Sequence, residues 1–313
     1  MAQLQWQFDA PTGTYKQHSL SKKLYEQALA ESVFMDHVSP IESFGKKMGE
    51  NVTLTRLATL SEPTSVTLTE GERIPEDSWS ITTTSITVVE IGRSVPYTSL
   101  LNDLSTFDLE NPIQRALKDQ MKLALDTKCA TAFKTAKVKY IPTGLSTGTF
   151  DTDGTASTTA SANLNVFHVE EIADYMYDTL LVPPIGDNYV GICRNLALRG
   201  IKRDPDWEEW HKYTDPSAKF NGEVGMIENV RFIKTNHSNA LSKVGTSSVL
   251  GESVFFGEDS VALAEVLTPE LRAAQPADFG RSKAVAWYGI LEFGIIWDTA
   301  NAGQARIVHM TSA

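Results

Sequence analysis

The sequence has few cysteines, no long apolar run and no excess of basic residues. Of its 313 residues only Cys129 and Cys193 are cysteines, too few for a disulfide framework or a zinc site, so we expect two buried free thiols. The longest apolar run, Ala284–Leu291, is too short to span a bilayer, and the first residues do not match a signal peptide. The formal net charge of −11 would repel nucleic-acid phosphates. Together these absences predict a soluble protein made in a reducing cytoplasm.

The sequence also has little that points to catalysis or to a cofactor. It contains neither of the glycine-rich loops that bind nucleotides, and its six histidines are scattered singly. Ser146 lies in a G-x-S-x-G pattern, but the Thr- and Ser-rich segment after it is unsuited to the helix that a nucleophile elbow requires. Asp151 and Asp153 lack the further ligands of a calcium loop. The carboxylates within 204–209 surround two tryptophans, a pattern more typical of a solvated loop than of a glycosidase pair.

We therefore predict no enzyme activity, no metal and no cofactor. A hydrolase that uses Ser146, or the carboxylates within 204–209, remains the alternative from another class of protein. A chain of this length without a recognisable active site favours a structural role.

What the sequence does have is a long, threonine-rich, β-patterned stretch. Asn51–Leu57 and Trp79–Pro96 alternate in the two-residue period of a strand, and between them Ser61–Asp77 carries two prolines, a glycine and many carboxylates. This predicts an extended β-hairpin with an acidic, exposed tip. The hairpin has too few large apolar residues to make its own core, and an isolated two-stranded ribbon is marginal in water. Something else must therefore support it.

A long amphipathic helix is expected next, over Pro112–Ala136. Asn111 is a good N-cap and Pro112 suits the first helical position. Apolar residues recur at spacings of three and four along one face. They are Ile113, Leu117, Met121, Ala124, Leu125, Cys129, Ala132, Phe133 and Ala136. The opposite, polar face is expected to contain Gln114, Lys118, Lys122, Asp126 and Lys134.

The rest of the chain predicts a mixture of short helices and strands. Residues 1–50 are polar and weakly patterned, which favours a strap across a surface, and Gly144–Asn163 is either a surface loop or a polar hairpin. Further helices are expected over Leu20–Met35, Val166–Leu181 (capped by Asn165) and Leu196–Arg203. Further strands are expected at Asn188–Cys193, within Gly222–Thr235, and at Ser253–Phe256, Ala284–Ile290, Phe293–Asp298 and Ala305–Met310. This order indicates an α+β fold and not a doubly wound parallel sheet.

The order of elements and three local phrases resemble the major capsid protein of tailed bacteriophages. This family has the Hong Kong 97-like fold, and the resemblance is to the branch typified by the coliphage N-four capsid protein. The phrases are WHKYTD at 210–215, NGEVGMIENVRFIKTN at 221–236 and SVFFGEDSVALAEV at 253–266. The resemblance covers nearly the whole chain. It implies an N-terminal arm (1–47), an extended β-hairpin loop (48–95), a peripheral domain (96–140 and 276–313) with a spine helix (112–136), and an axial α/β domain (141–275).

The resemblance also implies a function and a set of partners. The chain would self-assemble into the hexamers and pentamers of an icosahedral shell that encloses double-stranded DNA. It would be a virion component assembled in the host cytoplasm, with no membrane partner. Its implied partners are further copies of itself, a scaffolding protein, a portal protein, a cementing or decoration protein, and packaged DNA by non-specific proximity. An encapsulin-like compartment shell is the alternative within the same fold.

Two departures from the family prototype sharpen these expectations. The prototype joins its subunits by an isopeptide bond from a lysine in the extended loop, whereas no lysine occurs here between Lys47 and Lys118, so we expect a non-covalent shell. Only about 50 residues precede the loop, so we expect a separate scaffolding protein and not a fused one. The residues expected to contact neighbouring subunits are Arg56, Glu70, Glu72, Arg73, Glu76 and Asp77.

Overall fold

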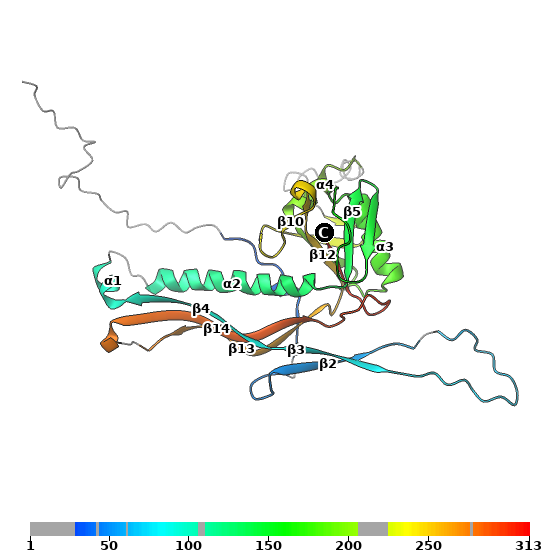
Figure 1. Cartoon of the computed structure of the whole chain (residues 1–313), viewed down its shortest axis with the longest axis horizontal. Coiled ribbons are helices and arrows are strands. Elements are labelled where there is room, and N and C mark those ends of the chain that lie inside the picture. Colours follow the sequence, from blue (N-terminus) through cyan, green and yellow to red (C-terminus); the bar gives the residue numbers. More distant parts are fainter. Residues whose placement is uncertain (1–28, 42–43, 61, 106–109, 206–224, 276–277) are drawn as a thin grey trace, which may run out of the picture.

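The structure, a computed structural model, describes residues 29–41, 44–60, 62–105, 110–205, 225–275 and 278–313. A long helix lies along an elongated sheet, a compact α/β unit is attached at one end of the helix, and a hairpin extends away from both (Figure 1). This is the α+β architecture that the sequence predicts. Within the described residues no helix is long and apolar enough to cross a membrane.

The elongated sheet has four strands in the order β1-β13-β14-β4. The strands are β1 (Ser39–Pro40), β4 (Val89–Thr98), β13 (Val261–Ala273) and β14 (Ser282–Ile295). The prediction of two closing strands over Ala284–Ile290 and Phe293–Asp298 is wrong, because the single strand β14 covers the first range and continues to Ile295 within the second. Its pairing with β13 continues without a break from Leu291 to Phe293, so nothing there ends the strand.

The long helix α2 (Glu110–Lys134) lies on this sheet, as predicted, within two residues of the expected ends. Leu117 packs with Val285 and Trp287 of β14 in one apolar cluster. Asn111 lies inside the helix and is therefore not its N-cap. Asp126 was expected on the polar face, yet its side chain is fully buried. A short helix, α1 (Ser99–Leu104), precedes α2.

The compact unit is built on a mixed seven-stranded sheet in the order β6-β5-β15-β12-β7-β9-β8. The strands are β5 (Val138–Gly144), β6 (Thr147–Asp151), β7 (Tyr189–Arg194), β8 (Met226–Ile227), β9 (Val230–Thr235), β12 (Ser253–Phe256) and β15 (Ile307–Met310). In the four central strands β15, β12, β7 and β9, neighbouring residues belong to two different apolar clusters, one on each face of the sheet. Helices α3 (Val166–Asp174) and α4 (Asn195–Lys202) cover one face, and the end of α2 covers the other.

Most of the smaller elements agree with the sequence. Asn165 caps α3 by accepting a 3.1 Å hydrogen bond from the backbone N–H of His168, and the helix continues as a single π-helical turn, η2 (Tyr175–Thr179). Of the two alternatives for 144–163, the structure shows a hairpin of β5 and β6 followed by a loop. The remaining elements are η1 (Met35–His37), β10 (Lys243–Val244), η3 (Thr246–Ser248), β11 (Leu250–Gly251) and η4 (Asp278–Gly280).

The projecting hairpin pairs β2 (Asn51–Leu57) with β3 (Ile81–Thr87) in antiparallel register, which confirms the predicted ribbon. The predicted single strand over Trp79–Pro96 is wrong, because it is divided at Val88. The Val88 N–H donates to the carbonyl of Glu50, after which the chain leaves the hairpin and continues as β4 beside β14. The second half of the expected ribbon therefore belongs to the elongated four-stranded sheet and not to the hairpin.

The described part of the N-terminal segment has no helix or strand before η1. The helix predicted over Leu20–Met35 is wrong for 29–34, and its earlier residues lie outside the described ranges. The backbone N–H groups of Glu31, Val33 and Phe34 donate to side chains of the body and not to carbonyls one turn back, so no helix can form there.

The domain boundaries implied by the resemblance stay a prediction. The two large sheets do not divide the chain at those boundaries. β13, within 141–275, pairs with β14 in the elongated sheet, whereas β15, within 276–313, lies between β5 and β12 in the compact unit.

Candidate assembly surfaces

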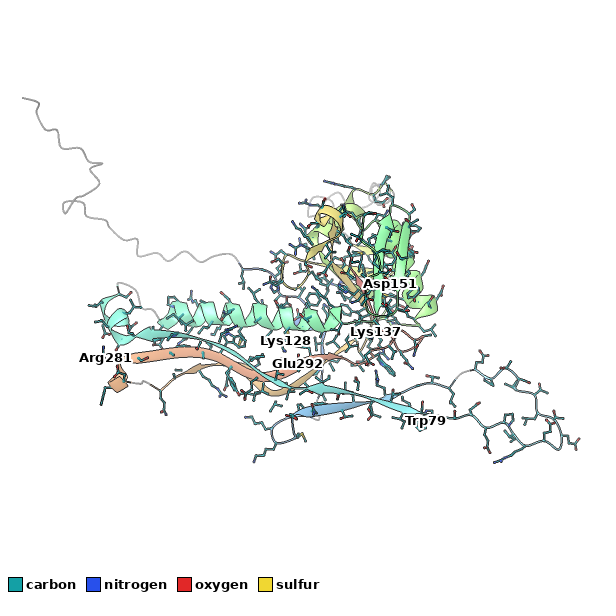
Figure 2. The ribbon with its side chains drawn as sticks, in the orientation of Figure 1. Trp79, Lys128, Lys137, Asp151, Arg281 and Glu292 are labelled. Carbon is teal, nitrogen blue, oxygen red and sulfur yellow. The ribbon has the colours of Figure 1, made fainter. Side chains whose placement is uncertain are left out.

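The outer part of the hairpin exposes large apolar side chains. Beyond Leu57 and before Ile81 the described chain has no strand pairing, and Trp79 projects from it (Figure 2). The exposed apolar residues here are Leu57, Leu60, Val66, Leu68, Ile74, Trp79 and Ile81, each with at least half of its surface in solvent. We call these seven the hairpin patch. So many exposed apolar groups on one thin projection indicate a surface that another molecule covers.

Five of the six predicted contact residues lie together at the tip of this hairpin. Glu70, Glu72, Arg73, Glu76 and Asp77 are all exposed, and the guanidinium of Arg73 forms an ion pair with the Glu76 carboxylate. Both partners of this pair are more than two-thirds in solvent, so the pair adds little to stability.

The sixth predicted residue, Arg56, is separate from the tip and lies at the root of the hairpin. Its side chain is 9% exposed and forms an ion pair with Asp298, which follows β14. The Arg56 guanidinium also lies 5.7 Å from the centre of the Trp297 ring. Its hydrogen bond to Asp298 holds the pKa of that carboxyl below its usual value. Arg56 thus joins the root of the hairpin to the segment that follows β14.

A small apolar cluster also attaches the hairpin root to the elongated sheet. Val52 of β2 and Ile86 of β3 are buried with Ala262 and Ala264 of β13. Ile86 sits against Gly294, where an added Cβ would lie 2.6 Å from the isoleucine Cγ1. The hairpin is thus held at its base by its own chain, while the outer part has no support in the monomer.

The N-terminal strap is fixed to α2 by one buried carboxylate. Oδ1 of Asp126 accepts hydrogen bonds from Ser32 Oγ, Val33 N and Phe34 N at 2.9–3.1 Å. Its Oδ2 lies 2.8 Å from Nδ1 of His237, which follows β9. The Phe34 ring is fully buried against Phe133. Helical periodicity assigned Asp126 to the polar face of the helix. The one signal for its burial in the sequence was that it follows Leu125, which belongs to the apolar face.

Charged side chains join α2 to both sheets. Lys128 forms a 2.7 Å ion pair with Glu292 of β14 (Figure 2). At the end of the helix, Lys134 Nζ lies 2.8 Å from the carboxylate of Glu252, just before β12. Lys139 of β5 donates to the backbone carbonyl of Lys134 at 2.6 Å. The last carbonyls of a helix have no hydrogen-bond donor within the helix, and Lys139 provides a donor for one of them.

Two ionisable groups beside that junction have shifted pKa values. Burial lowers the pKa of His309 on β15 to about 4, and its Nδ1 lies 3.0 Å from Lys139 Nζ. Burial opposes ionisation of Glu252, but the nearby His309 ring and the donors of Lys134 and Ser242 outweigh it and hold the Glu252 pKa below its usual value. The end of the spine helix therefore rests on a buried, pH-sensitive network.

The residues considered for catalysis are not arranged as an active site in the described chain. Ser146 lies in the exposed turn between β5 and β6, so a strand follows it and not a helix. Asp151 accepts hydrogen bonds from Ser157, and Asp153 accepts from the Thr155 N–H, as expected of local turns. No cluster of metal-ligating residues occurs in the described ranges. Of the carboxylates within 204–209, only Asp204 lies in those ranges.

Both cysteines are buried free thiols, as predicted. Burial raises the pKa of Cys193 to about 12, and burial together with the nearby Asp126 raises that of Cys129 still further. Neither thiol is therefore suited to act as a nucleophile.

No protein-family profile matches the chain, and no curated protein sequence matches it. Solved structures do match. The capsid of cyanophage Pam1 superposes with a TM-score of 0.71 at 14% identity, covering 97% of this chain and 98% of that chain. The capsid of cyanophage P-SCSP1u gives 0.69 at 12% identity, covering 96% and 95%. The capsid of Helicobacter pylori bacteriophage KHP30 gives 0.69 at 12%, covering 94% and 95%. The shared fold thus extends over nearly the whole chain.

Proposed function

We propose that this chain, which has the Hong Kong 97-like fold of phage capsid subunits, is a major capsid protein. It self-assembles into hexamers and pentamers of an icosahedral shell, and it is a component of the virion. The observation that carries this proposal is the hairpin patch. Seven apolar residues on a ribbon without a core are exposed to water in a monomer, which is unfavourable. Another copy of the chain can cover them.

The proposal includes the partners that such a shell needs. They are a separate scaffolding protein, a portal protein, a cementing or decoration protein, and double-stranded DNA enclosed without specific contacts. We also propose that the chain belongs to the branch of the coliphage N-four capsid protein, and the phrases at 210–215, 221–236 and 253–266 support this assignment.

We further propose that the shell is held without covalent bonds between subunits. No lysine lies between Lys47 and Lys118, so the hairpin has no side-chain amine that could form an isopeptide bond. The exposed apolar side chains of the hairpin patch, and the tip charges around them, are left to hold a neighbour by packing and hydrogen bonding.

Electron microscopy of the full-length chain, expressed with its candidate scaffold, tests the proposal. We expect uniform shells. A double variant, Val66→Asp and Ile74→Asp, should keep the thermal unfolding of the subunit but lose the shells, because both side chains are exposed and a buried charge in the contact is unfavourable. Leu145→Asp, in the exposed turn between β5 and β6, is the matched control and should still assemble.

A wild-type chain that stays monomeric or dimeric under every condition would contradict the proposal. Mass spectrometry of purified native particles distinguishes the alternative within the fold. A genome and a portal protein indicate a virus, whereas an enzyme cargo indicates an encapsulin-like compartment.

A further inference from the structure

A second exposed apolar surface lies at the far end of the elongated sheet, opposite the compact unit (Figure 1). Here α1 and η4 meet, and the hydrogen bond between Ser99 and Gly280 joins residues 181 positions apart. Leu100, Leu101 and Leu104 of α1 are 68%, 56% and 77% exposed, and Phe279 of η4 is fully exposed. The hairpin patch does not include any of them.

Phe279 is held out by a backbone conformation that only glycine adopts easily. Asp278, Phe279 and Gly280 have φ values of 50°, 53° and 89°. Two consecutive non-glycine residues in the left-handed region are strained, and such strain concentrates at functional sites. In the monomer the ring is fully exposed, so no buried contact of the ring offsets this strain.

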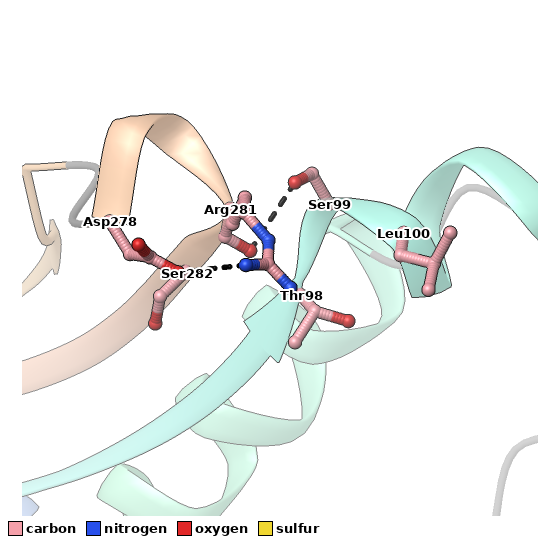
Figure 3. Close-up of a pocket in the computed structure, with 6 residues that line it drawn as sticks. All are labelled: Thr98, Ser99, Leu100, Asp278, Arg281 and Ser282. Carbon is pink, nitrogen blue, oxygen red and sulfur yellow. Dashed lines mark hydrogen bonds and ion pairs between the residues drawn. The ribbon is translucent and has the colours of Figure 1, made fainter.

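A pocket opens on the same end of the molecule, and Asp278, the residue before Phe279, is part of its wall (Figure 3). Its volume is about 170 Å³, and it is lined by Thr98, Ser99, Leu100, Asp278, Arg281 and Ser282. We call it the distal pocket. The Ser99 N–H and hydroxyl both donate to the backbone carbonyl of Arg281, which fixes the pocket wall at that point. The side chain of Arg281 stays 80% exposed.

We propose that Phe279 of one copy of the chain inserts into the distal pocket of another copy. The inference rests on the proposed function, because it assigns a second contact within the shell. The inserted ring would lie against the Arg281 guanidinium and the Leu100 side chain. A guanidinium over an aromatic face is attractive, and the attraction grows when the contact excludes water.

Charge complementarity favours a second copy as the occupant. Asp278 and Arg281 are only 3.5 Å apart and largely exposed, so each can pair across a contact with the opposite charge of a neighbour. The two lining charges cancel, which gives the pocket no preference for an anion or a cation. The projecting ring and the pocket that receives it lie on the same end, so the ends of neighbouring copies can form a closed, symmetric group.

Cross-linking tests the contact directly. Two single variants, Leu100→Cys and Phe279→Cys, are prepared separately, mixed and assembled, and then treated with a short bifunctional maleimide. Both native thiols are buried, so the introduced cysteines are the only exposed ones in the described chain. We expect a cross-linked dimer from the mixture that exceeds, by about tenfold or more, the product from Leu100→Cys alone. Dissociated subunits at the same concentration should give none.

Substitutions provide the second readout. Phe279→Ala and Arg281→Gln should leave the unfolding temperature of the isolated subunit unchanged and lower the yield of shells about tenfold, as loss of one good contact per subunit implies. Leu145→Ala, on the compact unit and also largely exposed, should change neither.

The outcomes separate the two proposals. Normal shells that give no mixed cross-link, or normal yields with Phe279→Ala, would overturn the distal contact and leave the capsid function intact. A wild-type chain that forms no shell and no oligomer would overturn both.

Discussion

The backbone N–H of Phe34 donates a 2.9 Å hydrogen bond to Oδ1 of Asp126, 92 residues further along the chain. This contact fixes the N-terminal strap to the middle of the spine helix. The strap in turn places the Phe34 ring in the core between α2 and the seven-stranded sheet. One buried carboxylate thus holds three parts of the subunit together, because His237 contacts its other oxygen.

Asp126→Ala should destabilise the subunit by about 3–5 kcal/mol, because it leaves buried donors of the strap and His237 without a partner. The midpoint of thermal unfolding should fall by on the order of 10 °C. Limited proteolysis should cut within the strap before the body. Asp119→Ala, exposed on the same helix, is the control and should change stability by no more than about 0.5 kcal/mol. A strap that resists protease in the Asp126 variant would contradict this prediction.

Arg56→Ala should loosen the hairpin without unfolding the body. The substitution removes the ion pair to Asp298 and the contact with Trp297, while the apolar cluster around Ile86 remains. We expect faster amide hydrogen exchange in β2 and β3 and unchanged exchange in α2. Arg73→Ala, at the exposed tip, is the matched control. Equal exchange in the two variants would show that Arg56 does not fix the root.

Acid should destabilise the junction at the end of the spine helix. The pKa of His309 is about 4 in the folded protein and 6.5 when unfolded, so between these values the unfolded state binds the extra proton. Stability should therefore fall as the pH is lowered from about 6.5 to about 4. Glu252 acts in the same direction at lower pH, since its stabilisation is lost as it protonates.

His309→Gln cannot take up this proton, so its unfolding temperature should depend less on pH than that of the wild type over that range. The groups that face His309 are Lys139 of β5, Lys134 of α2 and Glu252 before β12, and all three are unchanged in this variant. Parallel curves of unfolding temperature against pH for the two proteins would contradict the prediction.

Native particles should separate into single chains on a denaturing gel without any covalent ladder. The region between Lys47 and Lys118 contains no side-chain amine to form a cross-link. Bands at multiples of 34.4 kDa, resistant to reductant, would show that another lysine forms the bond.

The native thiols should react with maleimide only after unfolding. Cys129 and Cys193 are buried, and burial raises both pKa values, so the reactive thiolate is scarce in the folded subunit at neutral pH. We expect no labelling of the native chain in an hour and two labels per chain in denaturant. Rapid labelling of the native chain would indicate that the core around α2 opens.

The sequence by itself determined the periodic elements of this protein. The two-residue period and high threonine content of Asn51–Leu57 predicted a strand of the hairpin, and the three- and four-residue spacing from Ile113 onward predicted the spine helix. Both signals are local, because they depend only on how successive side chains are oriented along one element. The lack of a core in the hairpin was also predictable from its own residues, because too few of them are large and apolar.

Only the tertiary structure decided which side chains the periodic elements bury, and against what. Asp126 lies at a helical position that periodicity assigns to solvent, but the strap covers it. Val88 continues an alternating pattern, yet the chain changes sheets there because β14 offers β4 a partner. Phe279 resembles an ordinary core residue in sequence, and only the folded backbone holds it out. For Asp126 and Val88 the deciding contact joins segments distant in the chain, and no local pattern can encode it.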